Sequence, residues 1–199
     1  MLPIKLVLWI YKNGRVRITL RFLILLFLMF NTNIALSETQ NQVIKNKISE
    51  TILEKFIPNF KLVGRATYKF LLLDIYYATL ISETGHYPSD KFALILRYNR
   101  DFTKKSVVKE TVEQLQKQKK YSQSELIALK QLLNKTFRTI QKNDQFIAIK
   151  LLDKGIFYFK NEKVLETSDM DFLDLFFNIW LRENSQDPDF TKSLLGKDN

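Results

Sequence analysis

The sequence predicts an α+β domain, because segments with strand periodicity are followed by segments with helical periodicity. Three observations carry this prediction: a mostly apolar stretch at 62–81 that alternates like strands, a capping box that begins at Ser122, and an aromatic-rich helical segment at 171–181. The chain has 199 residues, which is enough for one domain with a sizeable core.

The stretch 62–81 is interpreted as two strands and not as a membrane span. Arg65, Lys69 and Asp74 lie inside it, and charged side chains are costly in a lipid-embedded helix. In its first half the even-numbered positions, from Leu62 to Phe70, are apolar, aromatic or glycine, whereas the odd-numbered positions include Arg65, Thr67 and Lys69. This period of two is typical of a half-buried strand, and a break near Asp74 separates it from a second strand.

The remaining elements follow from local signals. A loop of turn-forming residues at 82–90 precedes a third strand at 91–100, in which Phe92, Leu94, Leu96, Tyr98 and Arg100 share one face. Further elements are expected as helices at 103–119 and from 122, short strands at 144–152, 155–161 and 163–168, and helices at 171–181 and 188–195. Trp180, on the aromatic helix, is expected to be largely buried.

The N-terminal region has the order of a secretory signal peptide. Residues 1–37 hold five basic and no acidic residues, then an apolar run at 22–30 that is too short to span a bilayer, then Ala35-Leu36-Ser37 as a small-residue cleavage site. We expect an exported protein, periplasmic or secreted, with no stable membrane insertion after cleavage. The alternative is an uncleaved N-terminal anchor. An amphipathic helical segment at 38–60 and a domain at 61–199 follow.

Composition excludes several function classes. Half of the net charge of +10 lies in residues 1–37: without them, 26 Lys and Arg stand against 21 Asp and Glu, an excess too small and too dispersed to indicate nucleic-acid binding. The chain has no cysteine, which excludes disulfides, thiol catalysis and cysteine-ligated metal. No cofactor is expected, because the five glycines form no phosphate-binding loop.

Candidate catalytic and metal-binding groups have simpler interpretations. His86 is the single histidine and lies in a polar loop, where a solvated side chain is expected. Asp169, Asp171 and Asp174 are close together but fit the N-terminus of a helix, where carboxylates cap it and complement its dipole. No metal site is therefore expected.

Several segments together resemble a known family. They are "LVGRATYKFLLLDIYYATL" (62–80), "FALILRYNRDF" (92–102), "GIFYFKNEKV" (155–164), and "FFNIWL" (176–181) followed by "LLG" (194–196). Their order is similar to that of the bacterial chalcone isomerase-like family, exported relatives of the plant chalcone isomerases and fatty-acid-binding proteins. The resemblance implies an open-faced β-sandwich, in which an antiparallel sheet carries helices on one face with a ligand cleft between them.

The resemblance does not extend to the isomerase residues. The family's arginine lies two residues beyond a glycine, and here the residue two beyond Gly64 is Ala66. Arg65 is adjacent, but it would project from the opposite face of the strand. The family's tyrosine falls near Phe102, which has no hydroxyl, and its asparagine falls near Lys109 or Glu110. We therefore expect no catalytic residues, although a chalcone isomerase-type intramolecular lyase remains an alternative function.

The expected function is non-catalytic binding of an apolar, anionic, fatty-acid-like molecule between sheet and helices. Tyr98 and Arg100 would hold the head group, with Tyr68 and Tyr76 beside them and Trp180 along the tail. The alternative for Arg100 is that it reaches solvent or pairs with Asp101, and for the aromatic helix that it is plain core. A periplasmic scaffold protein without a ligand is a further alternative, and no protein partner is specified.

The leader generates the first testable prediction. Protein recovered from a periplasmic extract should have the intact mass of a chain that begins at residue 38. Full-length protein found only in the membrane fraction would contradict cleavage after Ser37.

Overall fold

The strands form one antiparallel sheet in sequence order. The structure, a computed structural model, describes residues 49–197. The six strands pair consecutively as β1 (Lys61–Phe70), β2 (Leu73–Ser82), β3 (Phe92–Tyr98), β4 (Gln145–Lys150), β5 (Gly155–Phe159) and β6 (Glu162–Thr167). The helices are α3 (Lys104–Gln116), α4 (Gln123–Thr136), α5 (Met170–Leu181) and α6 (Pro188–Leu194), after a helix at 49–56. The predicted α+β class with an antiparallel sheet is confirmed.

The predicted signal peptide at 1–37 lies outside the described residues, and so does the first part of the helical segment at 38–60. The part of that segment that is described ends its helix at residue 56, shortly before Pro58. Within residues 49–197 no helix combines the length and the apolar character that a membrane crossing needs.

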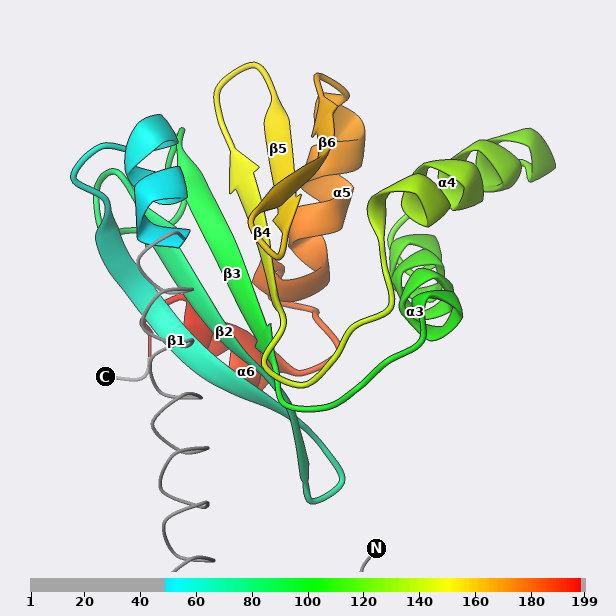
Figure 1. Ribbon diagram of the computed structural model, residues 1–199, viewed down its shortest axis with the longest axis horizontal. Helices are drawn as coiled ribbons and strands as arrows, with labels where there is room; N and C mark the ends of the chain where they lie inside the picture. Colours follow the sequence, from blue (N-terminus) through cyan, green and yellow to red (C-terminus); the bar gives the residue numbers. More distant parts are fainter. Residues whose placement is uncertain (1–48, 198–199) are drawn as a thin grey trace, which may run out of the picture. The chain divides into compact units, whose positions relative to one another are not determined.

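The two faces of the sheet belong to different hydrophobic clusters. On β3, Leu94 and Leu96 face the cluster that includes α3, α4, α5 and α6. Ala93 and Ile95 face a smaller cluster, to which the N-terminal helix contributes Leu53. The alternation predicted for this strand is therefore confirmed, and Figure 1 shows α3 and α4 side by side next to α5.

The predicted alternation of β1 holds only in the middle of the strand. Ala66 and Tyr68 pack against the helical side, but Leu62 and Phe70 are exposed. Register shifts between Leu62 and Gly64 and between Tyr68 and Lys69 interrupt the pairing with β2, and each such bulge resets the period of two.

Aromatic rings from α5 fill the space between helices and sheet. Phe176 meets Phe157 of β5 edge-on with ring centroids 5.0 Å apart, and Phe177 meets Phe92 of β3 at 4.8 Å. These rings are almost fully buried, as predicted, whereas Trp180 is only partly buried. Trp180 therefore lies at the edge of the core, although Leu181 at the end of α5 is buried.

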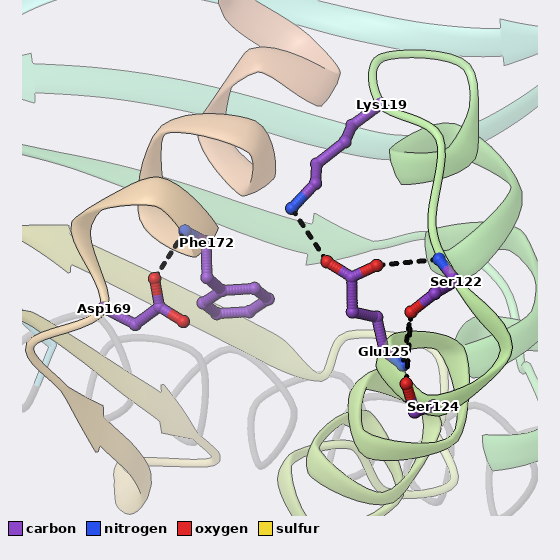
Figure 2. A network of polar contacts seen from close by, with 6 residues as sticks. All are labelled: Lys119, Ser122, Ser124, Glu125, Asp169 and Phe172. Atoms are coloured by element: carbon purple, nitrogen blue, oxygen red, sulfur yellow. Dashed lines mark hydrogen bonds and ion pairs between the residues drawn. The ribbon is translucent and has the colours of Figure 1, made fainter.

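The capping box at the start of α4 is present as predicted (Figure 2). Ser122 N donates to Glu125 Oε2 at 2.7 Å, Glu125 N donates to Ser122 Oγ at 3.3 Å, and Lys119 Nζ donates to Glu125 Oε1 at 3.2 Å. The Ser122 backbone bond, followed by the other bonds to this carboxylate, lowers the pKa of Glu125 to about 2. The box fixes where the second helix begins.

Helix α6 approaches β1 so closely that the contact requires glycine. A Cβ at Gly64 would lie 2.5 Å from the carbonyl oxygens of Ser193 and Leu194 and 2.8 Å from Gly196 N. Gly196 itself has a φ of 67°, and a Cβ there would lie 2.5 Å from Val63 O. Backbone thus packs on backbone, which is how the C-terminal "LLG" is held against the first strand.

The second prediction follows from this contact. Gly64→Ala should lower the free energy of unfolding by about 1–3 kcal/mol, because the added methyl group meets main-chain atoms that cannot move aside like a side chain. Urea unfolding measures it. Arg65→Ala, at the exposed neighbouring position, is the control and should change stability by less than about 0.5 kcal/mol. Equal stability of the Gly64→Ala variant and the wild type would contradict the close packing.

Candidate functional site

A cavity of about 380 Å³ lies between the strands β1 to β3 and the helices α3, α5 and α6. This volume is within the range of small-molecule sites in proteins. Its wall is rich in aromatic side chains, which come from all of these elements except α3 and from the segment after β3: Tyr68, Phe70, Tyr76, Tyr98, Phe102, Trp180 and Phe190. The wall also holds polar and acidic side chains: Ser106, Glu110, Thr111, Gln114, Ser185, Gln186, Asp187 and Thr191.

Three tyrosines form a row across neighbouring strands. Tyr68 is paired in register with Tyr76, and Tyr76 with Tyr98. The rings of Tyr68 and Tyr76 stack with centroids 5.1 Å apart, and Tyr98 meets Tyr76 edge-on at 5.9 Å. Phe190 of α6 contacts both stacked rings edge-on, at 5.9 Å from Tyr68 and 6.1 Å from Tyr76. The register of β1, β2 and β3 and the position of α6 therefore determine together how these four rings are arranged.

Two hydrogen bonds hold Trp180 next to the row of tyrosines. Trp180 Nε1 donates to Tyr76 Oη at 2.9 Å, and Thr191 Oγ1 donates to the Trp180 carbonyl at 2.7 Å. Burial raises the pKa of Tyr76 and of Tyr98 far above the ordinary tyrosine value. Both phenols are therefore neutral at any physiological pH, and neither supplies a negative charge or a base.

A chain of amide groups and carboxylates borders the other side of the cavity. Gln186 Nε2 donates to Tyr68 Oη at 3.1 Å. Gln114 Nε2 donates to Glu110 Oε1 at 2.8 Å and also to Gln186 Oε1. Burial raises the pKa of Tyr68, and the nearby charges of Glu110 and Asp187 raise it further. Both carboxylates thus act electrostatically on the same edge of the cavity.

The charge of the wall has one sign. Glu110 and Asp187 are the charged residues that line the cavity, and no described lysine, arginine or histidine does so. Lys117, which is exposed, contacts a lining residue from outside: its Nζ donates to Gln186 Oε1 at 3.4 Å. An anion inside the cavity would therefore meet repulsion without a compensating ion pair.

Four of the five residues expected at the site line the cavity: Tyr68, Tyr76, Tyr98 and Trp180. Arg100 does not, and it is exposed. β3 ends at Tyr98, whose backbone N–H and carbonyl bond to Asp144 and Asn143. The alternation that placed Arg100 on the face of Tyr98 does not continue beyond the end of the strand.

Sequence reasoning did not find the contributions of α3 and α6. Val107, Thr111 and Gln114 have the helical spacing that places them on one face, and all three line the cavity. This spacing was a usable signal, but Thr111 and Gln114 are polar and did not extend the apolar stripe. Phe190 and Asp187 come from a short C-terminal helix that carries no pattern of its own.

The other candidate groups have structural roles or lie elsewhere. Asp169 Oδ1 accepts from Phe172 N at 2.9 Å and caps α5 (Figure 2), and Asp174 pairs with Lys150 at 3.2 Å. His86 and Arg65 are exposed and outside the cavity wall. No cluster of metal-ligating side chains occurs within residues 49–197.

Comparison with known proteins agrees with this architecture. A family described as chalcone isomerase-like matches residues 42–196. Among solved structures, a fatty-acid binding protein of Arabidopsis thaliana is similar, with a TM-score of 0.53 and 15% identity, over 68% of this chain and 86% of the plant chain. At this identity the similarity shows the fold. A comparison with curated proteins gives no match. Because the family match spans most of the chain, this protein belongs to the chalcone isomerase-like family.

Proposed function

We propose that the protein binds an apolar small molecule in the cavity and does not transform it. The observation that carries this proposal is a preformed space of about 380 Å³ with a wall rich in aromatic side chains. The tyrosine row, Trp180 and Phe190 hold one another in place, so little ordering is needed when a ligand enters. The printed description of the plant structure as a fatty-acid binding protein supports a ligand with a hydrocarbon chain.

The charge of the wall supports an uncharged polar end on this ligand. A fatty-acid-like anion was expected because Arg100 would have met a carboxylate, but Arg100 is outside the wall and the charged groups present are carboxylates. A hydroxyl or amide can donate to Glu110 or Asp187, whereas a carboxylate cannot. We therefore propose that a neutral chain-bearing molecule binds more tightly than its carboxylic acid analogue at neutral pH.

The two alternative functions receive less support from the geometry. A scaffold role without a ligand implies a solid layer between helices and sheet, and the cavity interrupts that layer. An isomerase requires groups that polarise a phenolic substrate, but Arg65 is exposed on the other side of β1 and Phe102 lines the cavity without a hydroxyl.

Export is part of the proposal as well. The basic, apolar and small-residue order of residues 1–37 supports a secretory leader, and an exported binder would take its ligand outside the cytoplasm.

The third prediction concerns chain length. In a Trp9→Phe variant, Trp180 is the single tryptophan, and its fluorescence should change when straight-chain alcohols are added. Each further methylene that enters the cavity should tighten binding about fourfold, since its burial contributes about 0.8 kcal/mol. Val107→Phe, which fills part of the cavity, should weaken binding, and Ile127→Phe at an exposed position of α4 is the control. Unchanged fluorescence over the whole series would refute the proposal.

The fourth prediction concerns charge. At pH 7 the wild type should bind 1-dodecanol more tightly than dodecanoate. Glu110→Gln should reduce that preference by strengthening dodecanoate binding, because it removes one of the two repelling charges while keeping an acceptor for Gln114 Nε2. The matched control is Glu113→Gln, because Glu113 is on the same helix but does not line the cavity. A wild type that prefers dodecanoate would show that the head group is held elsewhere.

A further inference from the structure

The turn of the β1–β2 hairpin exposes four large apolar side chains in succession. The exposed fractions are 57% for Phe70, 82% for Leu71, 97% for Leu72 and 43% for Leu73. Figure 1 shows this hairpin extending beyond the ends of the other strands. We call residues 70–73 the hairpin tip. A contiguous apolar projection of this kind indicates a contact with something outside the chain.

Local folding does not account for these residues. Phe70 pairs with Leu73, so Leu71 and Leu72 form a two-residue turn. Leu71 has a φ of 56°, a conformation that glycine, asparagine and aspartate adopt readily and leucine does not. Leucine at this position makes the turn less favourable and leaves its side chain in water, which points to a requirement outside the fold.

Cations and an aromatic ring lie on the strands that lead to the hairpin tip and at the neighbouring end of β3. Lys69 lies next to it, with a 3.6 Å ion pair to Asp74, the acidic residue of the hairpin. Asn99 N donates to Ile75 O at 2.9 Å, which places the end of β3, and with it exposed Arg100, beside the start of β2. Arg97 of β3 lies over the partly exposed ring of Tyr77 of β2, with its Cζ 5.1 Å from the ring centroid.

We propose that the hairpin tip docks the protein peripherally on an anionic lipid bilayer. Phe70, Leu71 and Leu72 enter the boundary between head groups and acyl chains, Tyr77 lies at head-group depth, and Lys69, Arg97 and Arg100 face the lipid phosphates. Lys69, Arg97 and Arg100 outnumber the acidic residues beside them, Asp74 and Asp101, by one. This positive excess complements an anionic surface, which a purely apolar protein partner would not require. Phe70 and Ile75 also line the cavity, so the docked hairpin joins the bilayer to the cavity wall.

Site-specific labelling tests the contact independently of the N-terminal leader. The chain has no cysteine, so Leu72→Cys can be labelled alone with an environment-sensitive nitrobenzoxadiazole dye. Vesicles of phosphatidylcholine and phosphatidylglycerol in equal parts should shift the emission of this dye to the blue, more than vesicles of phosphatidylcholine alone. Leu152→Cys, another exposed leucine, is the control and should show no shift. No shift at position 72, or an equal shift at both positions, would overturn the proposal.

Vesicle cosedimentation of the cleaved chain that begins at residue 38, which lacks the basic and apolar leader, gives the second measurement. The double change Leu71→Asn and Leu72→Ser should weaken binding to the anionic vesicles by roughly tenfold or more, because two buried leucine side chains are lost. Asn suits the positive φ of Leu71, so thermal unfolding should show no loss of stability. Leu152→Ser should bind like the wild type. Wild-type binding by the double variant, or a concentration-dependent dimer that this variant abolishes without vesicles, would overturn the proposal, the latter in favour of self-association.

Discussion

The close approach of β1 to the end of α6 is the constraint on which the cavity depends. Gly64 and Gly196 allow main chain to lie on main chain, and a methyl group at either position would meet a carbonyl oxygen at 2.5 Å. This contact holds a seven-residue helix that has little stability alone. Because α6 is held there, Phe190 meets the rings of Tyr68 and Tyr76, and Asp187 and Gln186 reach the same cavity.

Hydrogen bonds between elements also hold the wall of the cavity in place. The Thr191 hydroxyl donates to the carbonyl of Trp180, and the Trp180 indole donates to Tyr76, so α6, α5 and β2 are tied in one chain of hydrogen bonds. These polar groups satisfy one another within the wall and do not need a ligand to do so. An apolar molecule could therefore enter without breaking these hydrogen bonds, which is the physical basis of the proposed binding role.

Patterns confined to one element were predictable from the sequence. The alternation of β3 distinguished its two faces, the Ser122 capping box located the start of α4, and the apolar crowding of α5 indicated its burial. Each depends on neighbours three or four positions away at most. The tyrosine row was predicted by face, because Tyr68 and Tyr98 share parity with apolar neighbours, but its acidic border was not: Glu110 and Asp187 come together only through the packing of α3 and α6.

The predictions were wrong where strand alternation was assumed beyond the regular part of a strand. Alternation was extended through Leu62 and Phe70 across two bulges, and to Arg100 past the end of β3. Strand parity is valid only while the ladder is regular, and no residue type marks these interruptions unambiguously. A family resemblance adds the fold to such reasoning, but it does not supply the charge of this cavity.

That charge bears directly on catalysis. Ring closure by a phenolic substrate develops negative charge on oxygen, and a catalyst stabilises it with preorganised cations or hydrogen-bond donors. Here the aligned position near the family's tyrosine is Phe102, the aligned position near its asparagine includes Glu110, and Asp187 adds a second carboxylate to the wall. The two carboxylates raise the energy of a phenolate relative to the phenol, as they raise the pKa of Tyr68. The cavity that we propose as the site of an apolar molecule therefore opposes the charge that the isomerase reaction would have to develop within it.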